Sequence, residues 1–275
     1  AQILLEISKS IQMKKRKSQA SAGTLDIWQK EIETSKIIQN NIFGVDINRD
    51  SVEITKLSLF LIMAKPGEKL TNISKNIIQG NAVVDDTEVD TYGFVWKDKF
   101  PKIIESGGFD IVIGNPPWQT VKPDVDEFFT PLKEMRLLLS VKYQNKSKKF
   151  SKLSVMSKDE FMKKCLEDKN IQQRYETYLS NYKTQCKYFK SSQQFTLQGT
   201  GDINLYKLFV EKSFKLLAEN GVFGMVIPSE FYYGDGTKKL RQFIFEKNSV
   251  QELCGFVNKK PIFDIHKQFK FCTLI

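Results

Sequence analysis

The sequence is poor in the residues that hold metal ions or form disulfides. Its 275 residues include a single histidine, His266, and four widely separated cysteines, Cys165, Cys186, Cys254 and Cys272. A structural zinc site needs cysteine or histidine ligands at short, characteristic spacings, and a disulfide framework needs a dense set of cysteines in a small secreted chain. We therefore expect reduced thiols and no bound metal.

Long hydrophobic runs are also missing. The longest aliphatic stretch, residues 57–64, is far shorter than the roughly 20 apolar residues that a helix needs to cross a bilayer. The first residues do not combine a charged segment, an apolar segment and a cleavage site, as a secretory leader does. With 41% hydrophobic residues the chain can still bury a substantial core. The sequence therefore predicts a globular protein of the cytoplasm with no part in a membrane.

The net charge of +10 is concentrated in one segment of the chain. Residues 141–190 hold 13 lysines or arginines against 5 aspartates or glutamates, and aromatic residues are interleaved with them. This composition is typical of a surface that binds nucleic-acid phosphates and offers stacking faces. In that interpretation, Lys146, Lys148 and Lys149 contact the DNA backbone. A solvated helical face whose aromatic side chains lie in the core has the same composition, and the two interpretations remain open.

Apolar strands alternate with amphipathic helices along most of the chain. We expect strands at residues 41–47, 76–81, 109–115, 222–228, 250–257 and 269–275, and helices at residues 49–64, 202–219 and 236–247. Residues 119–200 interrupt this alternation as a basic, mostly helical insertion. Continuously apolar strands that alternate with helices are typical of a parallel sheet covered on both faces. The predicted fold class is therefore α/β, with a doubly wound, mostly parallel sheet.

Three polar residues close successive predicted strands. Asp46 ends the first, Asn81 the second and Asn115 the third, at intervals of 35 and 34 residues. Ligands of doubly wound sheets bind beyond the carboxyl ends of the strands, where a carboxylate can accept the hydroxyls of a ribose and an amide can meet the edge of an adenine. Taken singly, Asp46 and Asn81 fit helix caps or turn residues better. Their shared position with Asn115 favours a ligand site.

The third strand runs directly into Asn115-Pro116-Pro117-Trp118. Proline has no N–H, fixes φ and favours an extended residue before it, so the two prolines form a stiff arm with free carbonyl groups. A rigid turn with a packed tryptophan would explain these four residues in isolation. It would not explain why they follow two strands that also end on polar residues, and we therefore favour a functional interpretation.

Such an arm suits the chemistry of an amine attached to an aromatic ring. This amine is a poor nucleophile because its lone pair is delocalised into the ring. If the Asn115 side-chain oxygen and the Pro116 carbonyl each accept one of its N–H groups, they stabilise the positive charge that develops on nitrogen. Trp118 can stack on the flat ring, as in enzymes that extrude a base from a duplex.

The segment "GFDIVIGNPPW", residues 108–118, is similar to the Asn-Pro-Pro-aromatic motif of S-adenosylmethionine-dependent adenine-N6 DNA methyltransferases. The wider pattern resembles the methylase part of large restriction-modification and phage-defence enzymes. This resemblance implies a Rossmann-like methyltransferase domain, S-adenosylmethionine as the cofactor and double-stranded DNA as the partner. It also implies catalysis by Asn115, Pro116, Pro117 and Trp118, and further domains of the same polypeptide for target recognition or DNA cleavage.

Three other segments extend the resemblance. "NIFGVDIN" (residues 41–48) resembles the strand end that holds the cofactor's ribose, and "NIIQGNAV" (residues 76–83) resembles the segment beside its adenine. "PIFDIHKQFKFCTLI" (residues 261–275) resembles the late hairpin where an aromatic side chain packs against the target base. The resemblance therefore implies cofactor contacts by Asp46, Ile47, Asn81, Ala82 and Asn115, and stacking on the target base by Trp118 and Phe263.

One element of that family is absent from the sequence, namely its glycine-rich cofactor loop. Residues 1–10 resemble the helix that follows this loop, and the last residues stop inside a predicted strand. We therefore interpret residues 1–275 as a fragment of a methyltransferase catalytic domain without the first strand and the glycine loop. The short motif also occurs in methyltransferases that act on protein glutamine or on RNA. The missing loop leaves a non-catalytic DNA-binding module as a further alternative.

Overall fold

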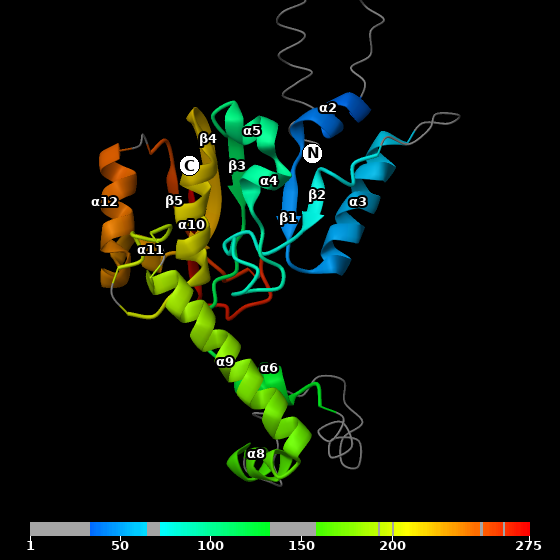
Figure 1. The fold of residues 1–275 in the computed structure, drawn as a ribbon. Helices are drawn as coiled ribbons and strands as arrows, with labels where there is room; N and C mark the ends of the chain where they lie inside the picture. The colour runs from blue at the N-terminus through cyan, green and yellow to red at the C-terminus, as the bar shows by residue number, and fades with distance from the viewer. Residues whose placement is uncertain are drawn as a thin grey trace, which may run out of the picture. The chain divides into compact units, whose positions relative to one another are not determined.

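A computed structural model describes residues 34–64, 72–132, 158–191, 193–199, 201–247, 250–260 and 262–275 (Figure 1). The chain divides into two compact units, Ala1–Pro101 and Lys102–Ile275. The described strands form a two-stranded sheet in the first unit and a four-stranded sheet in the second. The predicted α/β class is confirmed at this level.

The first unit combines helices with a short parallel sheet. Its described elements are α2 (Thr34–Asn41), β1 (Gly44–Asp46), α3 (Arg49–Met63), β2 (Ile77–Gln79) and α4 (Trp96–Lys99). α3 begins after Asn48, whose side chain accepts a hydrogen bond from the N–H of Ser51 at 3.0 Å, as expected for an N-cap. The buried Asn76 amide donates to the carbonyls of Gln39 (2.6 Å) and Ile42 (3.0 Å) and so ties β2 to the end of α2. The core of this unit consists of Ile38, Val52, Leu59, Met63, Ile73 and Ile77.

The second unit is built around a mixed sheet with the strand order β3-β4-β6-β5. Its elements in chain order are α5 (Pro101–Glu105, which begins on the last residue of the first unit), β3 (Phe109–Gly114), α6 (Val125–Phe129), α8 (Lys158–Leu166), α9 (Lys169–Ser191), α10 (Leu205–Leu216), β4 (Leu217–Pro228), α11 (Glu230–Tyr233), η3 (Asp235–Thr237), α12 (Lys238–Lys247), β5 (Leu253–Val257) and β6 (Lys270–Leu274). β3 pairs with β4 in parallel, whereas β6 runs antiparallel to both β4 and β5. The prediction of a mostly parallel sheet is therefore confirmed only in part: β3 and β4 are parallel, whereas β5 and β6 form an antiparallel hairpin, which the resemblance of residues 261–275 to a late hairpin had implied.

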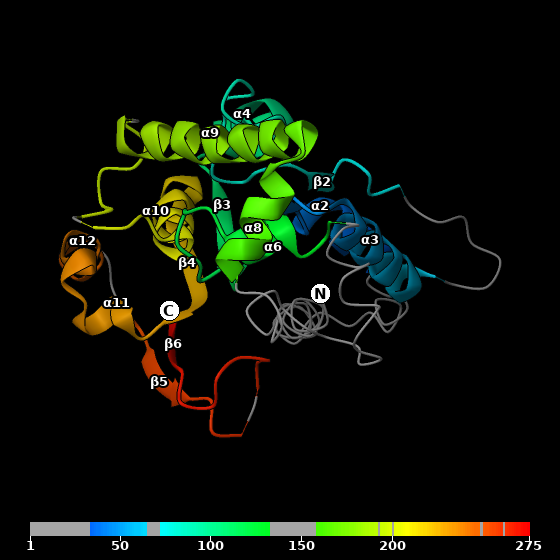
Figure 2. The ribbon, with the colours of Figure 1, turned by 90° about the horizontal axis from the view of Figure 1, so that it is seen from below.

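Helices α10 and α12 cover the core of this sheet, and α10 lies beside β4 (Figure 2). The core residues are Tyr206, Val210, Phe223, Met225, Ile227, Phe231, Leu240, Ile244, Cys272 and Leu274. On the edge strand β3, however, the side chains of Ile111 and Ile113 are 46% and 71% exposed. The expected burial on both faces is therefore not found for β3 among the described residues.

The helix predicted at residues 202–219 is shorter than expected. α10 ends at Leu216, and β4 begins at Leu217 and continues through Asn220-Gly221, the two residues that directly follow the predicted helix. The cause is strand pairing, since Phe109 of β3 lies opposite Leu217. A Cβ atom at Gly221 would lie 2.7 Å from the Leu217 side chain and 2.9 Å from the Phe109 carbonyl oxygen. Glycine is thus needed there for a close approach within the sheet.

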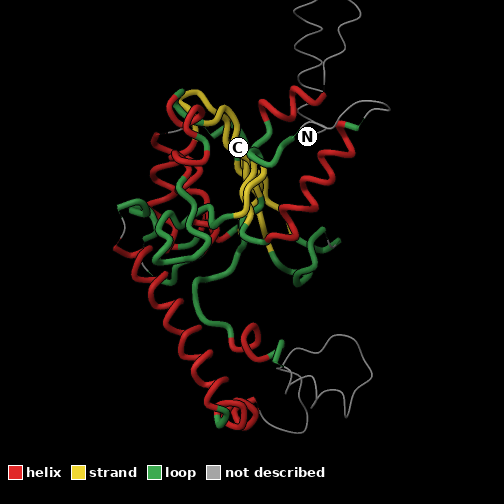
Figure 3. Tube along the Cα trace, turned by 45° about the vertical axis from the view of Figure 1, so that its right-hand side comes forward, coloured by secondary structure: helices red, strands yellow, loops and turns green. Residues whose placement is uncertain are grey.

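The described part of the insertion, residues 119–200, is helical apart from its connections (Figure 3). Its ends lie together, because Thr120 and Asn204 form an antiparallel bridge and the N–H of Val121 donates to the carbonyl of Ile203 at 2.7 Å. Several of its aromatic residues build a local core of Phe129, Leu132, Phe161, Cys165 and Ile171, against which Phe128 and Tyr175 pack. Because these rings pack in a local core, they favour the interpretation of a helical face with buried aromatic side chains over that of a surface that stacks on bases. Lys146, Lys148 and Lys149 lie outside the described residues.

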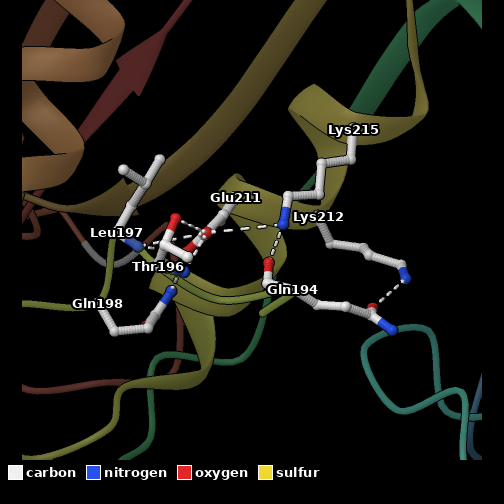
Figure 4. A network of polar contacts seen from close by, with 7 residues as sticks. All are labelled: Gln194, Thr196, Leu197, Gln198, Glu211, Lys212 and Lys215. Carbon is white, nitrogen blue, oxygen red and sulfur yellow. Dashed lines mark hydrogen bonds and ion pairs between the residues drawn. The ribbon is translucent and has the colours of Figure 1, made fainter. Parts of the chain in front are cut away.

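A buried carboxylate anchors the segment between α9 and α10 (Figure 4). Glu211 of α10 is 1% exposed and accepts hydrogen bonds from the N–H groups of Thr196 (2.7 Å) and Leu197 (3.1 Å) and from the Gln198 amide (2.8 Å). Lys215 approaches the same carboxylate at 3.8 Å and also donates to the Gln194 carbonyl. Three donors from residues 196–198 on one buried acceptor therefore hold the segment that returns from the insertion against the core helix α10.

The described part of the chain has neither a candidate membrane span nor a candidate metal cluster. None of its helices is long and apolar enough to cross a membrane. None of its clusters of histidine, cysteine, aspartate and glutamate contains three residues placed to hold a metal ion. The four cysteines are free thiols, with Cys165 and Cys272 buried.

Candidate active site

The segment Asn115–Trp118 follows β3 directly, and hydrogen bonds to β4 and α10 hold its C-terminal end. Trp118 donates through its indole N–H to the carbonyl of Val226 in β4, at 3.3 Å. Directly after it, the N–H of Leu205, the first residue of α10, donates to the carbonyl of Gln119 at 2.9 Å. The intervening prolines cannot rotate about φ, so the arm is stiff between two anchored ends.

Asn115 lies at the start of this arm with its side chain exposed, while Pro116 is buried. Within the described residues, neither the Asn115 amide nor the Pro116 carbonyl oxygen has a hydrogen-bond partner. An amide oxygen and a backbone carbonyl oxygen each have two lone pairs that can accept from a ligand. The arm therefore carries two acceptors that have no partner among the described residues, and their use for a ligand stays a prediction.

An aromatic cluster surrounds Trp118. Its ring is stacked on Phe269 at 5.4 Å and on Phe271 at 5.9 Å between centroids, and it meets Phe263 edge to face at 5.6 Å. Phe271 is buried, Phe263 is partly buried and Phe269 is 38% exposed. The structure thus brings together Trp118 and Phe263, the two residues predicted to stack on a base, although they are far apart in the chain.

Phe269 and Phe271 were not recognised as part of the site from the sequence. The signal was present, because side chains two residues apart in a strand point to the same face, and both lie within the predicted strand 269–275. Their contacts also mean that part of the Trp118 ring is packed against protein, as the alternative of a structural tryptophan requires. Only the ring surface left open by the cluster can receive a ligand.

In the first unit, Asp46 and Asn81 lie at the same end of the small sheet. The parallel register places Asp46 opposite Gln79, and the N–H of Gly80 donates to the carbonyl of Asp46 at 2.9 Å. Asp46 is exposed, and one of its carboxylate oxygens accepts from the N–H of Asn48 at 2.7 Å. Ile47 beside it is 50% exposed. A carboxylate and an apolar side chain are therefore accessible together at the carboxyl end of β1.

Asn81 is occupied by contacts within its own loop. Its side-chain N–H donates to Asp90 at 2.8 Å, and its side-chain oxygen accepts from the N–H of Val83 at 3.2 Å. This is the behaviour of a turn residue, the interpretation that Asn81 alone favoured. The backbone N–H of Ala82, by contrast, donates to no acceptor in the described part of the chain, while its carbonyl accepts from the Trp96 indole at 2.9 Å.

These residues fit an adenosine group in part. The exposed Asp46 carboxylate can accept ribose hydroxyls, Ile47 offers an apolar surface, and the Ala82 N–H can donate to a ring nitrogen. The Asn81 side chain would have to leave Asp90 before it could meet the edge of an adenine. Asn115 belongs to the second unit, so the expected single rim of Asp46, Asn81 and Asn115 stays a prediction.

A family model described as the Eco57I restriction-modification methylase matches residues 40–195 and 175–263. Because these ranges cover well over half of the chain, the protein belongs to this family of restriction-modification methylases. Among curated proteins, the chain is similar to the type II restriction enzyme and methyltransferase RM.Eco57I of Escherichia coli, with 23% identity over 231 residues. That alignment covers 80% of this chain and 17% of the relative, so the chain spans less than a fifth of the relative's length. The resemblance to a restriction-modification methyltransferase, drawn from the Asn-Pro-Pro-Trp motif, is confirmed.

Proposed function

We propose that this chain forms the catalytic part of a methyltransferase that acts on the N6 amine of adenine in double-stranded DNA. It would use S-adenosylmethionine within a restriction-modification or phage-defence system. The observation that carries this proposal is the exposed Asn115 amide on a rigid Pro-Pro arm, next to an aromatic cluster that contains Trp118 and Phe263. Membership of the restriction-modification methylase family supports it.

The arm is suited to activate an aromatic amine by charge stabilisation. S-adenosylmethionine would supply an electrophilic methyl group on a positively charged sulfur. Asn115 and Pro116 would accept the two N–H groups of the amine, which holds the nitrogen lone pair toward the electrophile and stabilises the charge that develops on nitrogen. The methyl–sulfur bond would break as the N–C bond forms, which would leave a neutral thioether. The extra proton on nitrogen could then pass to water, so the arm itself need not supply a base.

The aromatic cluster suits a base that has left the duplex. Adenine inside the helix is stacked and paired, and an enzyme that reacts at its amine must expose that amine. Phe263 and Trp118 would provide the surface that replaces the lost stacking, which is worth roughly 1–3 kcal/mol per base. The segment with the surplus of lysine and arginine would contact the phosphates and hold the duplex.

Asp46, Ile47 and Ala82 would hold the adenosine part of the cofactor, with Asn81 joining them after its turn contacts open. The outer edge of β3 supports the interpretation that a further strand with a glycine loop belongs to this Rossmann-like domain. Among the described strands β3 pairs with β4 alone, so its other edge has backbone N–H and carbonyl groups that no described strand pairs with. Such an edge is a ready partner for another strand.

The proposal is tested by Asn115→Ala in the full-length protein. We expect most methyl transfer to DNA to be lost while the affinities for DNA and for S-adenosylmethionine stay largely unchanged, because the contact matters chiefly as charge develops. Gln119→Ala, which removes an exposed amide four residues further along, is the matched control and should retain activity. Transfer of a labelled methyl group to DNA, protein and RNA is the measurement. Near-normal turnover by Asn115→Ala would refute the mechanism, and a preference for protein or RNA would refute the substrate.

A further inference from the structure

One buried side chain organises the loop that carries Phe263. Asn258 directly follows β5 and is 0% exposed, and the loop of residues 258–269 connects β5 to β6. Its side-chain N–H groups donate to the carbonyls of Phe263 (3.0 Å) and Ile265 (3.2 Å). Its side-chain oxygen accepts from the N–H groups of Ile262 (2.9 Å) and Phe263 (3.3 Å). The backbone N–H of Asn258 closes the loop by donating to the carbonyl of Phe269 at 3.0 Å.

This pattern requires an amide. Two of the side-chain contacts use Asn258 as a donor and two use it as an acceptor, and among side chains of this size only asparagine offers both. An aspartate could keep the bonds from Ile262 and Phe263 but would face two carbonyl oxygens with a negative charge. Because the site excludes water, the mismatch would be costly.

Apart from short-range turn hydrogen bonds, such as those from Ile265 N–H to the Phe263 carbonyl and from Phe269 N–H to the His266 carbonyl, the loop has few side chains that pack against the rest of the unit. Ile262 is 67% exposed, and Asp264 and His266 are also exposed. Two rings are the exception: Phe263 contacts Trp118 at 5.6 Å and Phe271 at 5.1 Å, and Phe269, the last residue of the loop, stacks on Trp118 at 5.4 Å. Segments with little apolar burial open easily unless hydrogen bonds hold them. Asn258 bonds to both the N–H and the carbonyl of Phe263, so it determines where the backbone of this residue lies.

We propose that Asn258 is a positioning residue that sets Phe263 against Trp118, so that the aromatic surface is formed before the target base arrives. The inference rests on the proposed function, in which Phe263 stacks on the target base. Asn258 is buried and does not touch that substrate. Its contribution is pre-organisation, since an ordered loop need not lose its conformational freedom when the base binds.

The test is a double-mutant cycle in the full-length protein with unmethylated genomic DNA as substrate. Asn258→Asp should lower kcat/KM for DNA by about tenfold to a hundredfold, the range that loss of base stacking would produce. In a protein that already carries Phe263→Ala, the same change should have little further effect on kcat/KM. Both substitutions remove the same contribution, namely the stacking of Phe263 on the target base. Gln268→Glu introduces the same charge change at an exposed position of the same loop and should leave kcat/KM unchanged. Losses that multiply in the double variant would overturn the proposal, because Asn258 would then act independently of Phe263.

A second variant avoids a buried charge. Ile262→Pro removes the backbone N–H that donates to the Asn258 side-chain oxygen, at a position whose side chain is exposed. Ile262→Ala keeps this N–H and serves as the control. We expect the proline variant alone to lower kcat/KM, by a smaller factor than Asn258→Asp, with a melting temperature close to that of the unsubstituted protein. Equal activity of the two Ile262 variants would overturn the proposal.

Limited digestion with trypsin separates this inference from the proposed function. Cleavage after Lys259 and Lys267, followed by mass spectrometry, reports the opening of the loop without any methyl transfer. It should accelerate in Asn258→Asp and not in Gln268→Glu. If the protein methylates no DNA, the proposed function fails, and the digestion still decides whether Asn258 holds the loop. Unchanged cleavage in Asn258→Asp would show that it does not.

Discussion

Replacement of Glu211 by alanine should destabilise the second unit strongly. Its carboxylate is 1% exposed and receives two backbone N–H groups and one side-chain amide at 2.7–3.1 Å. Removal of the carboxylate leaves these three donors without their acceptor. A hydrogen bond to a charged group contributes about 1.5–3 kcal/mol, so the three bonds together amount to roughly 5–9 kcal/mol before any compensation.

Two effects reduce that sum. Alanine does not have to be desolvated, whereas a buried carboxylate costs several kcal/mol to remove from water, and water can enter the space left beside the half-exposed Lys215. Breaking a buried charged contact typically costs about 3–5 kcal/mol, and we expect Glu211→Ala to lower the free energy of unfolding by that amount. Lys215→Ala should cost less than about 1 kcal/mol, because its ion pair spans 3.8 Å and its side chain is 43% exposed.

Urea denaturation followed by circular dichroism is the measurement. The midpoint should fall while the denaturant slope stays constant, since the slope reports the surface exposed on unfolding. Glu246→Ala, at an exposed position near the end of α12, is the matched control and should change stability by no more than about 0.5 kcal/mol. A loss below about 1 kcal/mol in Glu211→Ala would refute the reasoning, because it would mean that water replaces the carboxylate at almost no cost.

Three other predictions address the base, the DNA and a buried thiol. Phe263→Ala should weaken methyl transfer by roughly 1–3 kcal/mol if the ring stacks on the extruded adenine, and a mismatched partner base should restore part of it; equal damage on matched and mismatched duplexes, with a lower melting temperature, would indicate a core phenylalanine. Replacement of Lys146, Lys148 and Lys149 by alanine should weaken DNA binding at all sequences and flatten its salt dependence, because phosphate contacts release counterions; an unchanged slope in binding titrations would return the segment to a solvated surface. Burial raises the pKa of the Cys272 thiol to about 11. The unfolded thiol loses its proton near pH 8.5, so the stability that this group contributes is present below about pH 8.5 and is lost as the pH rises toward 11. Urea titrations of the parent protein and of Cys272→Ala should show this relative loss, and parallel pH profiles would contradict a buried neutral thiol.

Local patterns in the sequence predicted the elements that present the candidate site. β3 follows from a continuous apolar run, and the arm after it follows from two prolines whose φ angles are fixed by covalent chemistry. α3 occupies residues 49–63, almost as predicted, because Asn48 caps its first turn and apolar residues recur at helical spacing. The parallel direction of β1 and β2 was also expected, and their pairing brings Asp46 and Asn81 to the same end of the small sheet.

Errors arose where an element depends on residues that are distant in the sequence. Asn220-Gly221 has the local chemistry of a helix stop, yet these residues lie in β4 because pairing with β3 extends the strand backward to Leu217. The antiparallel direction of β6 depends on the turn back from β5. An apolar run does not specify this direction, and only the resemblance of residues 261–275 to a late hairpin implied it. Both outcomes follow from hydrogen bonds between strands, and no short window of sequence contains both partners.

The sequence by itself determined the chemistry that this protein carries: an amide on a rigid proline arm after a buried strand, a carboxylate at the end of another, and a strongly basic segment. These features depend on covalent structure or on neighbouring residues, so they can be recognised in the sequence before the fold is known. Only the tertiary structure decided that Trp118 packs among Phe263, Phe269 and Phe271, and that Asn258 holds the loop between them. A ring contact or a buried hydrogen bond depends on the positions of two groups at once, and folding alone sets those positions.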